Sequence, residues 1–145
     1  MAITDLKLVL SDAQAETTAA AHDSDNVVDM GAGYNEWGTA TIADYGETNK
    51  MWLNVKVNTL FATSASGTLA VALQDSADNS SFAAVSPALG CPATAAASLT
   101  AGLSLLRVPL PNGLRRYVKL VYTIAVGAMT AGAVDAWIGP PTEVD

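Results

Sequence analysis

The residues that could carry out chemistry are few, and the densest group is His22-Asp23-Ser24-Asp25. An imidazole beside two carboxylates is the beginning of a metal site, but a closed zinc site needs four ligands and His22 is the only histidine. A Ser–His–Asp triad would depend on the same histidine, in a segment with no evident means of holding a base rigidly. We therefore expect a solvated polar segment here and no metal.

Other candidate chemistry is equally sparse. Asp75, Asp78 and Asn79 resemble a fragment of a calcium loop, but the glycine and distal glutamate of an EF-hand are missing, which favours a turn. Asp135 comes nearest to a glycosidase carboxylate, yet no acid lies within an apolar run that would raise its pKa. Cys91 is the single cysteine, so no intrachain disulfide can form. We expect no catalytic residues, no cofactor and no enzyme activity.

Length and charge narrow the class of protein. A chain of 145 residues suits one domain with its own core. Residues 1–50 hold nine acids and two bases, whereas residues 51–145 are balanced, so the first third carries the whole net charge of −7. Phosphate backbones would repel this chain, which predicts no nucleic-acid partner. No apolar run is long enough for a membrane span, and the N-terminus does not resemble a secretory signal.

The strongest structural pattern runs from Leu114 to Ile138. Residues 117–126 alternate between two faces, with one face made of Val118, Leu120, Tyr122, Ile124 and Val126. A period of two in β-branched and aromatic residues is typical of a half-buried strand. Glycines then interrupt the pattern before it resumes near Val134, and we interpret the whole stretch as a β-hairpin.

Other segments give weaker strand patterns, and the segment after the first strand is ambiguous. Strands are predicted at residues 6–10, 26–30, 51–57, 69–73, 82–85 and 103–108, with long loops at 31–50 and 87–101. Residues 11–25 lack large apolar side chains and favour an extended arm, with a helix as the alternative. About eight strands predict an all-β, single-domain jelly roll or β-sandwich over residues 1–145. Its N-terminal arm and first strands would occupy residues 1–30, and residues 139–145 would form a mobile tail.

Three segments in order resemble a known family. They read LKLVLSDAQAETTAAAHDSDNVVDMG at residues 6–31, TLAVALQDSADNSSF at 68–82 and LRRYVKLVYTIAVGAMTAGAVDAWI at 114–138. Together they are similar to small capsid cement (decoration) proteins of tailed bacteriophages, of the jelly-roll type. The similarity is looser in residues 31–50 and 87–102. It also favours the extended arm over the helix at residues 11–25.

The resemblance implies a structural virion protein with no catalytic residues. Such a protein binds the outer surface of an assembled capsid, braces contacts between major capsid proteins, and associates with itself as a homotrimer or homodimer. It would be made in the cytoplasm of the host bacterium and would bind no nucleic acid and no membrane. The alternative is a carbohydrate-binding jelly-roll module or a receptor-binding virion domain. A catalytic jelly roll of the cupin kind would need several histidines.

Aromatic residues are the natural candidates for an interface. Three lie in the polar loop at 31–50, and two lie on the polar faces of predicted strands, where they could meet another subunit. Two acids of the N-terminal segment could meet a basic partner. The interface hypothesis therefore comprises Trp37, Tyr34, Tyr45, Trp52, Trp137, Asp23 and Asp25.

Overall fold

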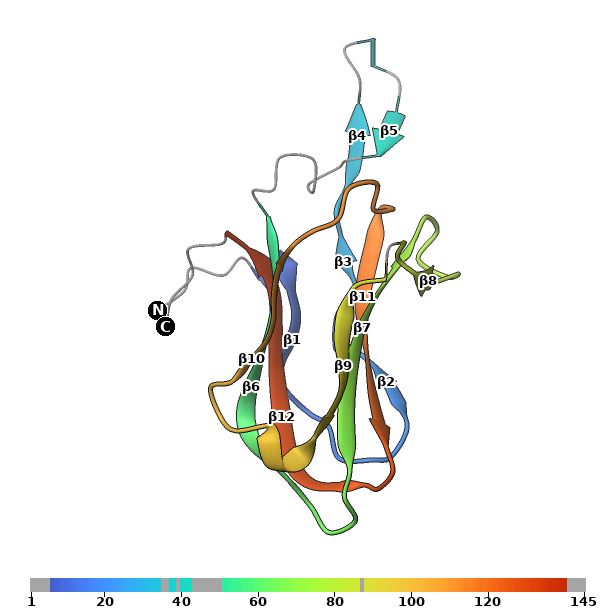
Figure 1. The fold of residues 1–145 in the computed structure, drawn as a ribbon. Helices are drawn as coiled ribbons and strands as arrows, with labels where there is room; N and C mark the ends of the chain where they lie inside the picture. Colours follow the sequence, from blue (N-terminus) through green and yellow to red (C-terminus); the bar gives the residue numbers. More distant parts are fainter. Residues whose placement is uncertain (1–5, 35–36, 39, 43–50, 87, 141–145) are drawn as a thin grey trace.

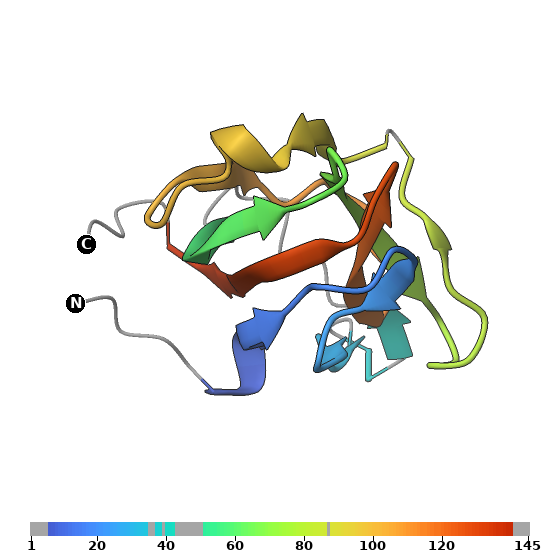
Figure 2. The ribbon, with the colours of Figure 1, turned by 90° about the horizontal axis from the view of Figure 1, so that it is seen from below.

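The computed structural model describes residues 6–34, 37–38, 40–42, 51–86 and 88–140. Two antiparallel β-sheets pack face to face as a sandwich, as predicted (Figure 1; Figure 2 shows the two layers from one end). The described residues form no α-helix, only two 3-10 turns, η1 (Leu6–Leu8) and η2 (Ala96–Ser98). No helix in these ranges is long and apolar enough to cross a membrane.

Sheet A has four strands in the order β1-β12-β6-β10, all antiparallel. Their bounds are β1 Val9–Ala15, β12 Met129–Gly139, β6 Trp52–Thr63 and β10 Ser104–Pro109. Strand β10 lies at an edge of the sheet. Its last residue is a proline, which has no backbone N–H, and an edge position tolerates this because one side of the strand needs no hydrogen bonds to a neighbouring strand.

Sheet B has six strands around the central pair β11 and β7. Strands β2 and β3 pair with one side of β11, and β8 and β9 pair with the far side of β7. The bounds are β2 Ala21–Asp23, β3 Val28–Asp29, β7 Thr68–Ser76, β8 Ala83–Ala84, β9 Gly90–Ala95 and β11 Tyr117–Ala125.

The connection order is that of a jelly roll. If β2 and β3 count as one strand, and β8 and β9 as another, sheet A carries the first, eighth, third and sixth strands of the chain. Sheet B then carries the second, seventh, fourth and fifth. Two interlocked Greek keys of this kind define the jelly-roll architecture, so the predicted fold is confirmed.

The core lies between the sheets and follows from the alternating pattern. Val118, Leu120, Tyr122 and Ile124 point inward from β11 and are at most 3% exposed. Leu53, Val55 and Val57 of β6 and Leu69, Val71 and Leu73 of β7 are also buried. Full burial of a Leu or Val side chain contributes about 1.5–3 kcal/mol, so these strands account for much of the stability.

The predicted hairpin at residues 114–138 is wrong in its pairing. Strand β11 lies in sheet B and β12 in sheet A, so the chain crosses from one layer to the other (Figure 1). The crossing begins at Val126, which has a φ of 69° and is 80% exposed, and therefore does not extend the inward face. Alternation defines the two faces of a strand but does not say which strand lies beside it.

The N-terminal segment is extended, as favoured, but it is part of the sandwich and not a separate arm. Residues 6–8 form η1, and β1 begins at Val9 and pairs with β12. Strand β2 then pairs with β11 in the other sheet. The predicted strand at residues 6–10 therefore starts too early, and residues 11–25 contain paired structure in both layers.

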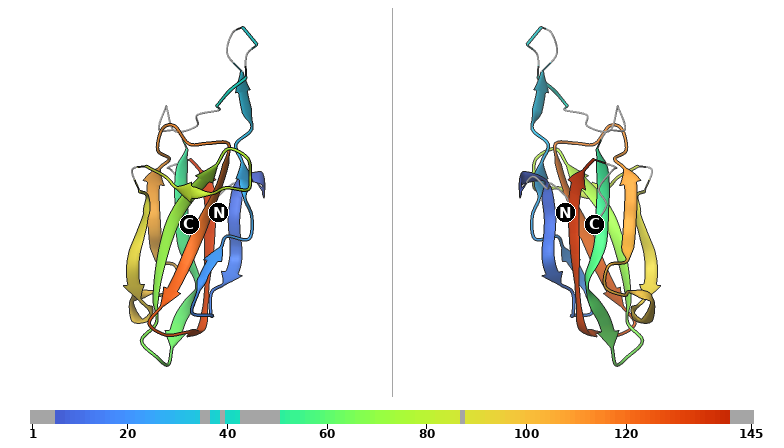
Figure 3. Two further views of the ribbon diagram at one scale, coloured as in Figure 1. Left: turned by 90° about the vertical axis from the view of Figure 1, so that its right-hand side faces the viewer. Right: turned by 90° about the vertical axis from the view of Figure 1, so that its left-hand side faces the viewer.

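Two predicted loops also contain strands. Within residues 31–50, β4 (Ala32–Tyr34) and β5 (Ala40–Ile42) pair as a two-stranded ribbon that projects beyond one end of the sandwich (Figure 3). Within residues 87–101, β9 pairs with β7 despite its Pro92. The predicted tail begins too early, because Gly139 still belongs to β12 and pairs with Trp52; residues 141–145 lie outside the described ranges.

Candidate functional site

The outward face of sheet A brings two of the predicted interface residues together. Trp52 pairs with Gly139, and Trp137 pairs with Asn54, so all four lie on one face. The opposite face of the same strands carries Leu53, Val55 and Ile138, which are buried in the core. We call Trp52, Asn54 and Trp137 the tryptophan patch.

The indole of Trp137 lies over Gly139. A Cβ atom at Gly139 would come within 3.3 Å of Trp137 Cδ1, so the glycine leaves room for the ring. The Nε1 atom of Trp137 is buried and, among the described residues, has no hydrogen-bond partner. Asn54 beside it is only 5% exposed and donates from Nδ2 to the carbonyl oxygen of Trp52 at 3.3 Å. An unpaired buried indole N–H is costly, and such groups call for an explanation.

The exposed tryptophan lies on the projecting ribbon. Trp37 falls between β4 and β5 and is 82% exposed, the highest value among the exposed large apolar side chains. Tyr34 belongs to β4, but its side chain is not described, and Tyr45 lies outside the described residues. The ribbon and the tryptophan patch belong to different parts of the fold.

The two predicted acids lie elsewhere. Asp23 in β2 is on the outward face of sheet B, where its carboxylate is 2.8 Å from Lys119 Nζ. The same ammonium lies 4.5 Å from the centre of the Phe82 ring. Asp25 lies at the β1–β2 edge, where it lines a pocket. The structure therefore separates Asp23 and Asp25 from the tryptophan patch.

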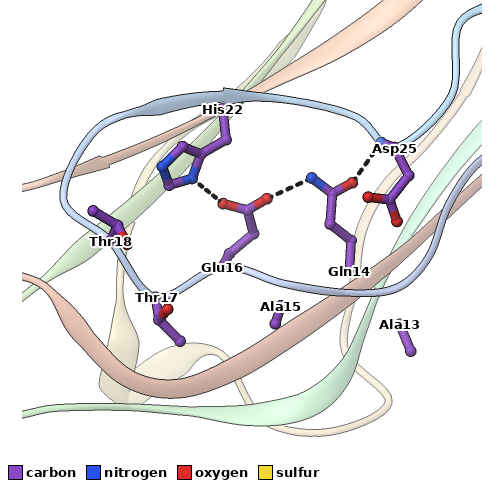
Figure 4. A pocket seen from close by; sticks show the side chains of 8 residues that line it. All are labelled: Ala13, Gln14, Ala15, Glu16, Thr17, Thr18, His22 and Asp25. Carbon is purple, nitrogen blue, oxygen red and sulfur yellow. Dashed lines mark hydrogen bonds and ion pairs between the residues drawn. The ribbon is translucent and has the colours of Figure 1, made fainter.

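That pocket is open, has a volume of about 470 Å³, and holds a polar network that sequence reasoning missed (Figure 4). The lining residues are Ala13, Gln14, Ala15, Glu16, Thr17, Thr18, His22 and Asp25. Glu16 is 1% exposed, and its Oε2 is 2.6 Å from His22 Nδ1. The expectation that residues 22–25 form a solvated polar segment is therefore wrong for His22, which is half-buried, and for Ser24, which is buried.

Strand geometry explains why these groups meet. Gln14 pairs with the buried Val134, and Ser11 with the buried Ala136, so both point between the sheets. His22 pairs with the fully buried Tyr122 and points inward from sheet B. The network thus closes the open edge of the sandwich between β1 and β2.

The hydrogen-bond directions follow from the backbone partners of Gln14. Its Nε2 lies 2.8 Å from the carbonyl oxygen of Asp23, which only accepts, and its Oε1 accepts from the backbone N–H of Asp25. With the amide orientation fixed, Nε2 donates to Glu16 Oε1 at 2.8 Å, and Ser11 Oγ donates to Gln14 Oε1 at 2.6 Å. The serine proton is then used, so the Tyr122 hydroxyl must donate to Ser11 Oγ at 2.8 Å.

Burial dominates the electrostatics of this network. It raises the pKa of Glu16 above 4.5, although the hydrogen bond and charge of His22 act in the opposite direction. It also raises the pKa of Tyr122, which stays a neutral donor to Ser11. Glu16 Oε2 and His22 Nδ1 are close enough to share a hydrogen bond.

The other candidate residues have structural roles. Asp135 accepts from the backbone N–H of Ala13 at 2.7 Å and from Asn58 Nδ2, which fixes an irregular turn of β1. Asp75 is paired with Arg115, whose Nη2 lies 2.7 Å from Oδ1. Asp78 accepts from the N–H groups of Ser80 and Ser81, as a turn residue does. No group of three or more potential metal ligands occurs in the part of the chain that the structure describes.

Fold and site together define a single-domain jelly roll that carries one exposed tryptophan, two half-buried tryptophans and an inward polar network. Comparison with family models matches the Bbp16 family over residues 10–138, which is most of the chain. The chain therefore belongs to the Bbp16 family, a phage-related family. A search of curated proteins finds no match.

Proposed function

We propose that this protein is a structural virion protein that binds the outer surface of an assembled phage capsid and braces contacts between major capsid proteins. The observation that carries the proposal is membership of a phage-related family over residues 10–138. The jelly roll and its surface tryptophans support it, because tryptophan is enriched among the residues that contribute most to binding at protein interfaces. No catalytic activity is part of this proposal.

The tryptophan patch is the proposed self-association surface. Half-buried Trp52 and Trp137 lie on a sheet face whose other side is core, so a second copy could cover them without disturbing the fold. Symmetric homo-oligomers commonly bury such patches. We expect a homodimer or homotrimer, and sedimentation as a monomer at high concentration would contradict this assignment.

Trp37 on the projecting ribbon is the proposed capsid contact. A ribbon that extends beyond the sandwich can reach a neighbouring protein while the sheets keep their shape (Figure 3). One such contact is weak alone, but a protein that repeats it over a lattice gains attachment through multivalency. The acidic first third adds attraction to a basic surface, which salt would screen.

The test is co-sedimentation of purified protein with cognate capsids that lack it, followed by heating of the particles. Binding should raise the temperature at which the capsids break, and binding should weaken between about 0.05 and about 0.5 M salt. Trp37→Ala should reduce attachment, whereas Thr123→Ala, an exposed change on the outer face of sheet B, should not. Failure to bind the capsids, with retention on a polysaccharide column, would favour the carbohydrate-binding alternative.

A further inference from the structure

Residues 16–24, which follow β1 and include β2, carry part of the polar network across the open edge of the sandwich. At one end, the backbone N–H of Glu16 donates to Gly132 in β12 of sheet A. At the other, the N–H of Ser24 donates to Leu120 in β11 of sheet B. The side-chain contact between Glu16 and His22 lies between these anchors and joins the two layers directly.

The fixed amide of Gln14 limits where Glu16 can carry a proton. Glu16 Oε1 must accept from Gln14 Nε2, so any proton on the carboxyl group belongs on Oε2. That oxygen is 2.6 Å from His22 Nδ1. Two lone pairs facing each other at this distance would repel, and so would two protons. One proton between the two atoms therefore keeps the contact closed.

Counting protons gives three states of the pair. In the first, Glu16 is ionised, His22 is neutral, and the histidine proton must be on Nδ1. In the second, one proton is added, and it goes to Nε2, the ring nitrogen that points away from Glu16 in Figure 4. The bridging proton stays in place, on either Nδ1 or Oε2. In the third, a second added proton puts a donor on both facing atoms and breaks the contact.

We propose that Glu16 and His22 form a proton-sensitive latch across the β1–β2 edge, closed in the first two states and open in the third. The proposal rests on the burial of Glu16, the 2.6 Å contact and the fixed orientation of Gln14.

The charged and titratable groups around this pair come from the pocket rim and from β11 and β12. Asp25 is the neighbouring acid at the pocket rim, and its charge disfavours ionised Glu16. From β11, Tyr122 faces the network as a neutral donor, and Lys119 is paired with Asp23. From β12, Asp135 is held by the N–H of Ala13 and by Asn58.

The sign of the pH dependence follows from the raised pKa of Glu16. Because that pKa lies above its unfolded value of 4.5, the folded chain binds more protons than the unfolded chain between the two values. Stability from this group therefore increases as the pH falls through that window. At lower pH the third state, with a proton on both facing atoms, becomes relevant. The folded chain resists this second added proton, which limits the increase in stability on the acid side. The apparent pKa values belong to the coupled pair.

Side-chain ¹⁵N NMR of the intact protein can test the latch, because His22 is the only histidine. Above the titration of its resonance, wild type should show the Nδ1–H tautomer. Glu16→Gln offers a near-isosteric comparison: its amide oxygen must face Gln14, so its NH₂ must face His22 and should switch the ring to the Nε2–H tautomer. An Nε2–H ring in wild type, or the same tautomer in both proteins, would overturn the proposal. If Glu16→Gln does not fold, the wild-type tautomer decides.

The thermal midpoint measured across pH gives an independent test. His22→Asn keeps an N–H near the Nδ1 position but cannot take the added proton. The difference in midpoint between wild type and His22→Asn should change with pH over the range in which the histidine resonance titrates. A constant offset would show that the contact is structural only. Asp29→Asn is the control, because Arg116 holds the pKa of that exposed carboxyl low and its effect should appear only at more acidic pH.

Discussion

Tyr122→Phe removes one oxygen atom from the middle of the sandwich and tests the polar network by itself. Tyr122 is fully buried, and its hydroxyl lies 2.8 Å from Ser11 Oγ, which is also buried. A buried hydrogen bond contributes about 0.5–1.5 kcal/mol net, and an acceptor left without its donor costs about 1–3 kcal/mol. Ser11 still donates to Gln14, so we expect the free energy of unfolding to fall by about 1–2 kcal/mol.

Urea denaturation at fixed protein concentration, followed by tryptophan fluorescence, measures this change. The matched control is Tyr117→Phe, a half-buried tyrosine on the outward face of the same strand, which should change stability by less than about 0.5 kcal/mol. Ser11→Ala completes a double-mutant cycle. If the hydroxyls are bonded, the double variant loses less than the sum of the single variants by at least about 0.5 kcal/mol. Additive losses would show that the hydroxyls of Ser11 and Tyr122 are not hydrogen-bonded to each other.

Three further outcomes are expected. Leu120→Ala, at a fully buried core position, should lower the free energy of unfolding by about 2–5 kcal/mol, and a loss below about 0.5 kcal/mol would contradict the inward facing of β11. Deletion of residues 1–25 should unfold the protein because it removes β1 and β2 from both sheets, and a native-like circular dichroism spectrum would show otherwise. Burial alone would raise the pKa of Asp75, but hydrogen bonds and charge from Arg115 lower it below 3.8. The stabilisation from ionised Asp75 is therefore present above pH 3.8 and lost as the pH falls further. In Asp75→Asn, the free energy of unfolding should depend less on pH in that acidic range.

The sequence predicted which side of a strand faces the core better than it predicted which strands pair. The alternation of Val118, Leu120, Tyr122 and Ile124 identified the inward side of β11, because side chains in a strand alternate by geometry. Partners depend on contacts far along the chain, so the same pattern could not show that β11 and β12 lie in different sheets.

The polar segments were the hardest to predict. Strand β9 was missed because its Gly, Pro and Ala residues have low strand propensity, and pairing with β7 overrides that preference. Glu16 was missed because acids are seldom buried without a partner, and the partner, His22, could not be inferred from composition. The spacing of Gln14 and Glu16, two residues apart and hence on one strand face, was the available signal.

The candidate interface was predicted in part. Period-two facing placed Trp52 and Trp137 on the polar faces of their strands, and the register of β6 and β12 shows that these faces form one outward side of sheet A. Asp23 and Asp25 do not join them, because β2 belongs to the other sheet. A local sequence pattern does not indicate to which sheet a strand belongs.

The position of β12 within sheet A has a consequence for how the protein is made. This last strand of the jelly roll lies between β1, the first, and β6, so the N-terminal strand has no neighbour in its sheet until β12 is present. On a ribosome, β1 must therefore wait for more than a hundred residues of synthesis, with its pairing edge and the facing edge of β6 both unpaired. Long-range pairing of this kind makes folding slow and exposes nascent chains to association with one another. Yield in cells should therefore depend more on translation rate and chaperones than on the stability of the finished sandwich.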